Sequence, residues 1–335
     1  MSDSQLNGAE QPLQLSFRKL WIFNGLLAGL AVVLAYLPIH ELPDRKGRPP
    51  ALIPLSFQAV ELGPAAAPLH LAGSWIVIAG DPRFHGLSGL VIDRDRFLAV
   101  SDLGALVSFD LPTASRPKAY IRDLTEGPGR FGNKWSRDAE SIARDEHGRG
   151  WWVGFEQTHS LWLYEPSFDH SIVSIDLKQH EWPDNRGAEG LLAMKRRLLV
   201  VAENGSDAID VGPDGIRRLP LDAGAEVADA AMAPNGTPWL LLRSKGADGI
   251  RQWIAPLLFD GRQYRAGAAL QLPKDALDNY EGMAIASLPD GRWRFWLITD
   301  DGHRFMARTL LVALDYESAA HSKSPATSAG PSRTR

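Results

Sequence analysis

Residues 187–205, GAEGLLAMKRRLLVVAENG, carry the pattern from which the fold can be predicted. An acidic residue, Glu189, precedes a short apolar run, and Lys195 and Arg196 then mark a turn. A second run, rich in leucine and valine, ends at another acidic residue, Glu203. Two apolar runs joined by a tight polar turn predict a β-hairpin, whose first and last residues lie at the same end.

The same layout recurs four more times along the chain. The other segments are GLSGLVIDRDRFLAVSDLG (86–104), DAESIARDEHGRGWWVGFEQ (138–157), VADAAMAPNGTPWLLLRSKG (227–246) and YEGMAIASLPDGRWRFWLITDDG (280–302). With Ser88, Glu140, Glu189, Asp229 and Glu281 taken as equivalent opening residues, the repeats are spaced by 52, 49, 40 and 52 positions. Hairpins at this spacing, without helical periodicity between them, are typical of propeller blades of about four strands.

The sequence therefore predicts an all-β protein, a six-bladed β-propeller. The content of 11 tryptophans, 31 glycines and 23 prolines agrees with a turn-rich β architecture. Five blades come from the five repeats. LHLAGSWIVIAG (69–80) precedes the first repeat and ARTLLVALDY (307–316) follows the last, so we expect these ends to pair as a sixth blade and close the ring. Rings of five or seven blades remain alternatives.

The two ends of the chain differ from the repeats. Residues 20–37 carry no charge and follow Arg18 and Lys19, which predicts a membrane-anchor helix behind a cytoplasmic tail of residues 1–19. The propeller is then expected outside the cytoplasmic membrane, in the periplasm or beyond. Cleavage of a signal peptide after Ala35 is the alternative and would give a secreted protein. Residues 38–50 are interpreted as a linker, 51–318 as the propeller and 319–335 as a disordered tail.

Composition excludes several kinds of chemistry. The net charge is −4 and there is no basic stretch, which argues against nucleic acid as a partner. Cysteine is absent, so disulfides, zinc–thiolate sites and thiol nucleophiles are excluded. The sequence contains no P-loop, dinucleotide fingerprint or His-x-x-His cluster.

The polar residues that open and close each hairpin are expected to meet at one mouth of the central channel. The candidate metal ligands among them are Glu140, Glu189, Asp229, Glu281, Asp102, Glu156, Glu203, Asp300 and Asp301. At the fourth repeat the closing position is Arg243, which interrupts the ring of carboxylates. Converging carboxylates repel one another unless cations compensate them, and a hard cation such as Ca²⁺ prefers oxygen ligands.

Basic residues and histidines near these acids suggest further roles. Arg137, Arg186, Arg304 and Lys134 are candidates to bind an anionic group of a substrate. His159 and His303 are candidates for acid–base work, each against the simpler reading of a surface histidine. A Ser88 nucleophile with His85 as base is disfavoured, because HGLSG is not a nucleophile elbow and no α/β alternation surrounds it.

Several motifs carry a family resemblance from about Phe57 to Tyr316. They are, in order, DPRFHGLSGL…AVSDLG, KWSRDAESIA…WWVGFEQTHSLWLY, NRGAEGL…VVAENG, DAAMAPNGTPWLLLRS and DNYEGMAI…FWLITDDGHR…RTLLVALD. In this order they resemble the phytase-like domain family with esterase-like activity. The resemblance implies a propeller and a hydrolase, related to calcium-dependent phytases that cleave phosphomonoesters. Gly302 and His303 stand where family members commonly have asparagine after the paired acids.

The leading functional hypothesis is a metal-dependent hydrolase of an anionic small-molecule ester, phosphoric or carboxylic. A lactonase of the gluconolactonase type, for which Asn204 and Asn279 are available, is a second enzyme hypothesis. The third hypothesis is a membrane-tethered propeller that binds a ligand without chemistry, because the fold hosts many unrelated functions.

Overall fold

The computed structural model describes residues 47–131, 134–180, 182, 186–247, 249–274, 278–302 and 307–317. The predicted anchor, residues 20–37, and the predicted tail lie outside this part of the chain. Within the described part, no helix has the length and hydropathy needed to cross a membrane.

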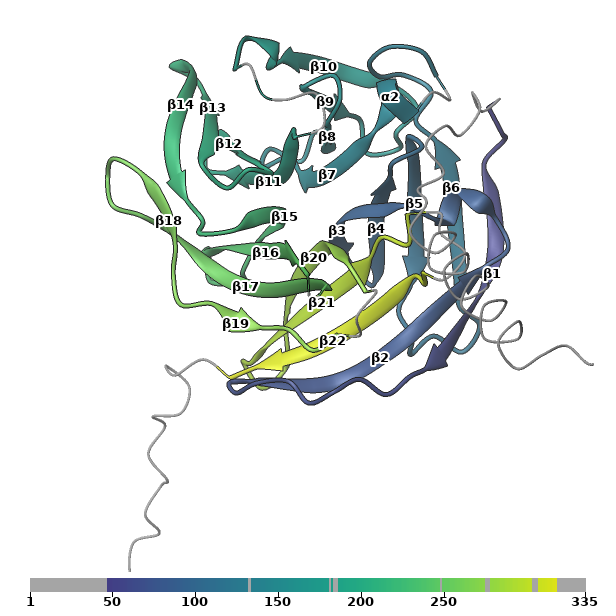
Figure 1. Cartoon of the computed structure of the whole chain (residues 1–335). Helices are drawn as coiled ribbons and strands as arrows, with labels where there is room; N and C mark the ends of the chain where they lie inside the picture. Colours follow the sequence, from purple (N-terminus) through teal and green to yellow (C-terminus); the bar gives the residue numbers. More distant parts are fainter. Residues whose placement is uncertain are drawn as a thin grey trace, which may run out of the picture.

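Antiparallel sheets surround a central axis in the described structure (Figure 1). The first three, which we call blades 1 to 3, each have four strands. Blade 1 consists of β3 (Leu87–Asp93), β4 (Arg96–Ser101), β5 (Ala105–Asp110) and β6 (Lys118–Asp123). Blade 2 consists of β7 (Ala139–Arg144), β8 (Trp151–Phe155), β9 (Ser160–Tyr164) and β10 (Ser171–Asp176). Blade 3 consists of β11 (Ala188–Met194), β12 (Arg197–Ala202), β13 (Asp207–Gly212) and β14 (Gly215–Asp222).

Blades 4 and 5 complete the ring. Blade 4 consists of β15 (Glu226–Met232), β16 (Pro238–Gly246), β17 (Gly249–Phe259) and two short strands on β17, β18 (Tyr264–Ala266) and β19 (Leu270–Gln271). Blade 5 consists of β20 (Tyr280–Ser287), β21 (Trp293–Thr299), β22 (Leu310–Tyr316) and β2 (Leu69–Ala79). The short helices are η1 (Pro82–Phe84), α2 (Lys134–Arg137) and η2 (Lys178–His180).

The innermost strand of each blade is the first strand of one sequence repeat. β3, β7, β11, β15 and β20 pack side by side in that order, and β20 returns to β3. This closed contact ring defines a five-bladed β-propeller. The five hairpins predicted from the sequence are thus confirmed as the two inner strands of the five blades.

The predicted count of six blades is wrong for the described residues. The two terminal segments do pair, because Leu69 to Ile76 of β2 lie opposite Tyr316 to Leu310 of β22. However, the last repeat supplies only β20 and β21, so β22 and β2 are needed as the outer strands of blade 5. Pairing across the termini therefore completes the fifth blade rather than forming a sixth.

Two further pairings join neighbouring blades at their outer edges. β1 (Ala51–Ala59) pairs antiparallel with β2 of blade 5 and with β6 of blade 1. β14 of blade 3 runs parallel to β18 of blade 4 for two residue pairs. These pairings occupy strand edges that would otherwise offer unpaired N–H and C=O groups to other chains.

Aromatic side chains fill the wedges between neighbouring blades. Phe97 of blade 1 meets Trp296 of blade 5 edge to face, with ring centroids 5.0 Å apart. Trp239 of blade 4 meets Phe295 of blade 5 at 5.1 Å. Trp296 and Trp239 thus act in packing between blades.

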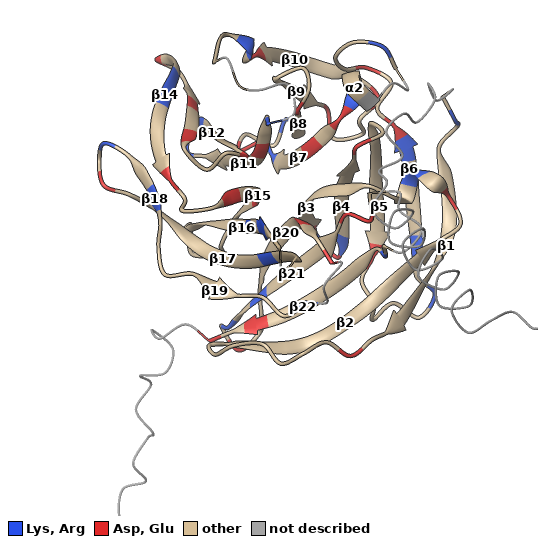
Figure 2. Cartoon of the chain, viewed as in Figure 1, with Lys and Arg blue, Asp and Glu red and all other residues tan. Residues whose placement is uncertain are grey.

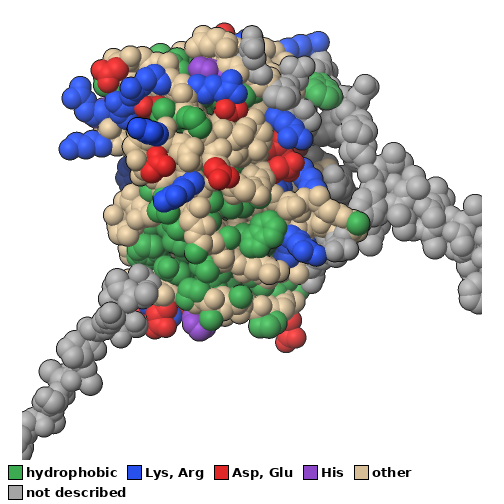
Figure 3. Space-filling view, turned by 60° about the vertical axis from the view of Figure 1, so that its left-hand side comes forward, with side chains coloured by type: hydrophobic (Ala, Val, Ile, Leu, Met, Phe, Trp, Pro, Cys, Tyr) green, Lys and Arg blue, Asp and Glu red, His purple; other side chains and the backbone are tan. Residues whose placement is uncertain are grey.

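On the outside of the ring, the side shown in Figure 3 carries basic side chains toward one end and hydrophobic side chains toward the other.

Candidate functional site

The two ends of each inner hairpin meet, as predicted. The N–H of Glu156 donates to the carbonyl of Asp138 at 2.9 Å, and that of Glu203 donates to the carbonyl of Gly187 at 3.2 Å. The residues that open and close these hairpins therefore lie at one mouth of the channel. Figure 2 shows acidic positions on β7, β11 and β15 and a basic position on β16 around the centre of the ring.

A β-bulge in each innermost strand sets the direction of the side chains at this mouth. The register of pairing skips one residue, which is Glu140 in β7, Glu189 in β11 and Glu281 in β20. The skipped residues of β3 and β15 are Gly89 and Ala228. A bulge re-aims the side chain of the extra residue, so three of the five blades offer a glutamate at the same structural position.

The bulges also change which residues are equivalent. Ser88 and Asp229, which the repeats place in the opening set, flank the bulge instead of occupying it. In blade 1 the residue after the paired Val100 is Ser101, so Asp102 lies one position beyond the closing set. The sequence repeats were one residue out of structural register here, because a bulge adds a residue without changing the hydrophobic pattern.

Carboxylates from blades 2 and 3 gather in two groups that share one member. The first group is Asp138, Glu140 and Glu156, and the second is Glu156, Glu189 and Glu203. In each group, one oxygen of every carboxylate lies within 4.8 Å of the others. All of these residues are buried except Glu140, which is half-buried. Four of the nine predicted metal ligands thus lie together, joined by Asp138, and they are Glu140, Glu156, Glu189 and Glu203.

Arg243 of β16 lies beside the second group and is only 5% exposed. Its guanidinium donates to Glu203 at 2.5 Å, to Glu226 at 3.3 Å and, by a shorter contact, to Glu281. Lys245 and Arg186 stand further out, at 3.4 Å and 3.9 Å from Glu226. The residue that interrupts the carboxylate ring is therefore the cation that holds blades 3, 4 and 5 together at the mouth.

The charges of this cluster shift its protonation equilibria. Burial raises the pKa of Glu189 well above that of an ordinary glutamate, and the negative charges of Glu140 and Glu156 raise it further. Burial also raises the pKa of Glu281, although Arg243 opposes that shift. For Arg243, burial lowers the pKa, but Glu281 and the neighbouring glutamates outweigh it, so the net pKa is raised. The mouth is thus short of positive charge at neutral pH.

Some oxygens at the mouth have no hydrogen-bond donor. Oε2 of Glu281 is buried and has no partner, whereas Oε1 accepts from Arg243 and, at 2.6 Å, from Asn279. Oδ1 of Asn279 is likewise buried without a donor. Among the described residues, the carboxylate of Glu189 makes no hydrogen bond or ion pair. Buried acceptors without donors are rare and call for water or a cation.

Asp229, a predicted metal ligand, lies outside the two carboxylate groups and bonds to the backbone of neighbouring strands. Its carboxylate accepts the N–H groups of Met283 at 2.6 Å, Leu90 at 3.4 Å and Ala230 at 2.7 Å. The first two belong to β20 and β3, so Asp229 of β15 ties three innermost strands together. Beyond this level the channel contains a cavity of about 250 Å³, lined mainly by apolar side chains of the five innermost strands together with Arg144 and Trp151. The acidic mouth is therefore confined to one end of the channel.

A histidine–carboxylate pair lies between blades 5 and 1 at the same end. His85 Nδ1 is 2.5 Å from Asp301 Oδ2, and Asp301 also accepts from the Gly86 N–H and the Thr309 hydroxyl. Asp301 is 4% exposed, whereas the His85 side chain is 43% exposed. A buried carboxylate that orients an accessible imidazole is the arrangement used for proton transfer.

The other acidic candidates lie close to this pair. The carboxylate of Asp102 packs against the Cα of Gly86, and Asp300 accepts the N–H of Gly302 at 2.6 Å. The N–H of Asp300 donates to the carbonyl of Asn279, and the side-chain amide of Asn279 donates to Glu281. This region is therefore connected to Glu281. Asp300 and Asp301 thus lie at the mouth but outside the two carboxylate groups.

The remaining predicted residues have these positions. Arg137 is buried, and its guanidinium donates to the carbonyls of Leu124 and Thr125, so it is engaged with the backbone. His159 is also buried, with Nε2 3.1 Å from the carbonyl of Trp182. Arg186 is 45% exposed beside Glu203. His303 and Arg304 lie outside the described residues, as does the side chain of Lys134.

Sequence reasoning missed three features of this mouth. Arg243 interrupts the acidic pattern of the sequence, and an arginine at an otherwise acidic position is itself a signal of charge compensation. Glu226 lies outside the repeat alignment. His85 and Asp301 are 216 residues apart, so only the tertiary structure reveals the pair.

The spacing and chemistry of these donor oxygens fit a metal ion. A calcium ion binds oxygens at about 2.4 Å, so two ligands on one ion are at most about 4.8 Å apart. The two carboxylate groups satisfy this limit. They contain only carboxylate oxygens, which suit hard cations rather than metals that prefer nitrogen or sulfur. The residues therefore fit one or two hard divalent cations.

The ring of five blades and the acidic mouth together define the class of protein. It is a five-bladed propeller with a buried acidic site at one end of its channel. The sequence of residues 82–303 matches the family described as "Phytase-like: Esterase-like activity of phytase". This match covers more than half of the chain, and the protein belongs to the phytase-like family.

Comparison with other proteins gave only distant similarity. No curated protein matches the sequence. The fold is similar to glutaminyl cyclase of Myxococcus xanthus, at 12% identity and a TM-score of 0.46, over 76% of this chain and all of that one. It is similar to hydrazine synthase of Kuenenia stuttgartiensis, at 12% identity and a TM-score of 0.38, over 64% of this chain and 56% of that one. A protein of unknown function from Bacteroides thetaiotaomicron matches at 11% identity and a TM-score of 0.40, over 79% of this chain and 76% of that one.

Proposed function

We propose that the protein is a hydrolase of small anionic esters, phosphoric or carboxylic, that uses divalent cations held at the acidic mouth. The observation that carries this proposal is the pair of carboxylate groups that share Glu156. Asp138, Glu140 and Glu156 would hold one cation, and Glu156, Glu189 and Glu203 a second. Calcium is the cation that we favour, because every donor is a carboxylate oxygen.

The charge balance supports a role for cations in binding the substrate. Among the described residues around the two groups, seven carboxylates face three cations. The carboxylates are Asp138, Glu140, Glu156, Glu189, Glu203, Glu226 and Glu281, and the cations are Arg243, Arg186 and Lys245. An anionic ester is repelled by such an excess of negative charge. Bound divalent cations would reverse the sign, polarise the ester and lower the pKa of a water molecule.

The residues of the chain itself supply the remaining steps. Arg186 and Lys245 have half-exposed side chains and long contacts to the acids, so they can turn toward an anionic group of the substrate. His85, oriented by Asp301, would transfer a proton to or from the reacting oxygen. Arg243 is held by three glutamates and would stay in place to keep the mouth assembled.

The experiment is a comparison of Glu189→Gln with the parent protein. This change keeps the volume but removes a buried charge from the second carboxylate group. We expect folded protein whose calcium affinity, measured by thermal shift, falls at least about tenfold. Hydrolysis of p-nitrophenyl phosphate and p-nitrophenyl acetate should fall with it, and a chelator should abolish hydrolysis by the parent.

Ser88→Ala is the matched control, because Ser88 is buried in β3 of the same mouth and is assigned no chemical step. Its calcium affinity and activity should equal those of the parent. Loss of activity in Ser88→Ala beside an unchanged Glu189→Gln would favour a serine nucleophile instead. Stabilisation by calcium without turnover of either ester would favour a propeller that only binds its ligand.

A further inference from the structure

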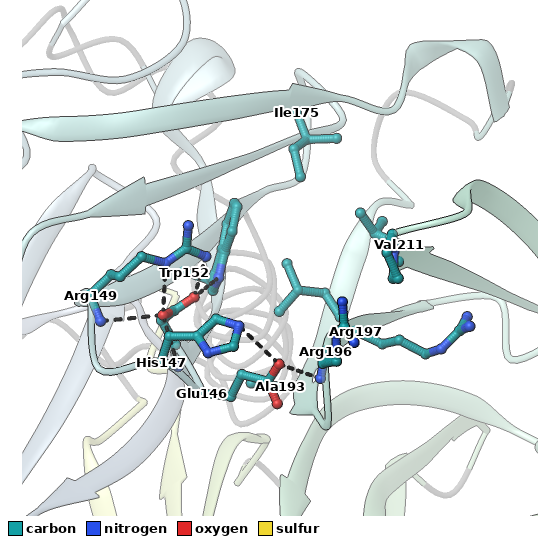
Figure 4. Close-up of a pocket in the computed structure, with 13 residues that line it drawn as sticks. Glu146, His147, Arg149, Trp152, Ile175, Ala193, Arg196, Arg197 and Val211 are labelled. Atoms are coloured by element: carbon teal, nitrogen blue, oxygen red, sulfur yellow. Dashed lines mark hydrogen bonds and ion pairs between the residues drawn. The ribbon is translucent and has the colours of Figure 1, made fainter.

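A second pocket lies at the opposite end of the ring, between blades 2 and 3 (Figure 4). Its volume is about 290 Å³, at the lower end of the range for small-molecule sites. Asp145, Glu146, His147 and Arg149 of the β7–β8 turn and Arg196 of the β11–β12 turn form its rim. The acidic mouth lies at the other ends of these same hairpins, so the two sites are separate.

The floor of this pocket is the open end of an apolar core. Trp152 and Leu198 are 5% and 6% exposed and belong to the cluster packed between blades 2 and 3. Ile175, Ala193 and Val211 pack against that cluster but are only partly buried. Figure 4 shows Trp152, Ile175 and Val211 around the pocket. An apolar group bound here would bury surface that the two blades leave exposed, which favours binding.

The rim carries charges, and most of them are already paired. Arg149 donates to Asp145 at 3.0 and 2.8 Å, and the pKa of Asp145 is lowered to about 2 mainly by this hydrogen bonding. Trp152 Nε1 also donates to Asp145, at 3.1 Å. Arg197 pairs with Asp210 and, at 3.2 Å, with Asp214. These pairs fix the walls of the pocket and leave little net charge on them.

Arg196 is the exception on this rim. Its backbone N–H donates to the carboxylate of Glu146, which also lies 3.3 Å from His147 Nε2. These contacts fix the β11–β12 turn against the β7–β8 turn, as the dashed lines in Figure 4 show. The exposed guanidinium of Arg196, however, makes no hydrogen bond or ion pair within the described part of the chain. The pocket therefore combines an apolar floor with one uncommitted cation at its edge.

We propose that this pocket binds a small amphipathic anion, a compound with one flat apolar group and a single carboxylate or phosphate. The apolar group lies over Trp152, Ile175 and Val211. The anionic group faces Arg196, whose planar guanidinium suits two oxygens at once. The volume of the pocket limits the apolar part of the ligand to about the size of a fused two-ring system. The single free cation limits the ligand to one anionic group.

The test is binding of 2-naphthoate to the full-length protein, measured by ligand-observed NMR titration in the presence of a chelator. The chelator makes the result independent of the acidic mouth and of the proposed hydrolase activity. A ligand of this size is expected to have a Kd on the order of 1 mM. 2-Naphthalenemethanol, which lacks the charge, and acetate, which lacks the rings, should bind at least about fivefold more weakly.

Two variants and one control make the test specific. Arg196→Gln should weaken naphthoate binding about tenfold, and Val211→Phe should abolish it by filling the pocket. Arg94→Gln is the matched control, because Arg94 is exposed in the β3–β4 turn with φ 59°, close to the 58° of Arg196, but lines neither pocket described here. The proposal is overturned if naphthoate does not bind the parent, if Arg196→Gln binds as tightly, or if the neutral alcohol binds as well as the acid.

Discussion

At the level of single residues, Arg243 is the side chain that determines the electrostatics of the mouth. It is buried with Glu203 and Glu281 and also reaches Glu226, which is partly exposed. A buried ion pair contributes little net stability compared with apolar groups, but removal of one partner leaves a buried charge without compensation. The importance of Arg243 therefore lies in the three carboxylates that would remain if it were lost.

We expect Arg243→Met to lower the free energy of unfolding by roughly 3–5 kcal/mol at pH 7 in the absence of divalent cations. The pKa of Glu281 is already raised in the folded protein, and loss of Arg243 would raise it further. A raised pKa means that the folded state binds more protons than the unfolded state. The free energy of unfolding therefore falls as the pH rises above about 4.5. The deficit of the variant should thus shrink as the pH is lowered toward that value.

Urea unfolding of parent and variant at several pH values measures this effect. Arg292→Met is the control, because Arg292 forms a more exposed ion pair with Asp290 at 2.7 Å. Solvent screens an exposed pair of this kind, so Arg292→Met should leave the free energy of unfolding nearly unchanged. A deficit in Arg243→Met that is small or independent of pH would contradict the assignment of Arg243 as the compensating cation.

At the level of the elements, the bulges of the innermost strands decide what reaches the mouth. Three bulges carry a glutamate, while the bulge of β3 carries Gly89. Gly89 has φ +54°, and a Cβ there would lie 2.9 Å from the N of Ile142 and 3.0 Å from the Cα of Ser141. The contacts are with the backbone of β7, so a side chain has no space between blades 1 and 2.

Gly89→Ala should therefore lower the free energy of unfolding by about 2–4 kcal/mol, from the left-handed backbone and from crowding against β7. Gly148→Ala is the matched control: Gly148 has φ +70° with nothing within 4 Å of its Cβ position. Gly148→Ala should lower the free energy of unfolding by only about 1–2 kcal/mol. Chemical unfolding curves compare the two, and equal losses would show that β3 and β7 are not tightly packed at this bulge.

For the whole molecule, closure of the ring depends on segments from both ends of the described chain. β2 pairs with β22, and β1 connects β2 to β6. Without β22, β21 and β2 would each have an unpaired edge and the core between blades 4 and 5 would lose Leu310, Val312 and Leu314. The blades should consequently unfold together rather than one at a time.

We expect residues 47–317 to fold without the rest of the chain and to melt in a single transition by circular dichroism. A chain that ends at residue 309, and so lacks β22, should not give a cooperative transition. In cell fractionation, residues 47–317 should be soluble, whereas the full chain should remain with the membrane if residues 20–37 act as an uncleaved anchor. A folded, cooperative product from the shorter chain would contradict closure through β22.

Local sequence patterns were enough to predict the class of fold and the convergence of acidic residues at one mouth. The alternation of short apolar runs with polar turns is a local pattern, and it predicted each inner hairpin, such as 187–205, and the common end of Glu189 and Glu203. It also predicted that acids would converge, because hairpin ends lie side by side whatever the blade count.

The number of blades in the ring and the set of acids that share a site depend on contacts that form when the whole chain folds. The pairing of Leu69 with Tyr316 and of His85 with Asp301 joins residues far apart in the chain, and local periodicity carries no information about such contacts. The bulges moved Asp229 out of the carboxylate set, and packing brought Arg243 among the glutamates. Register and long-range pairing depend on how the blades pack around the axis, and packing is a property of the whole chain.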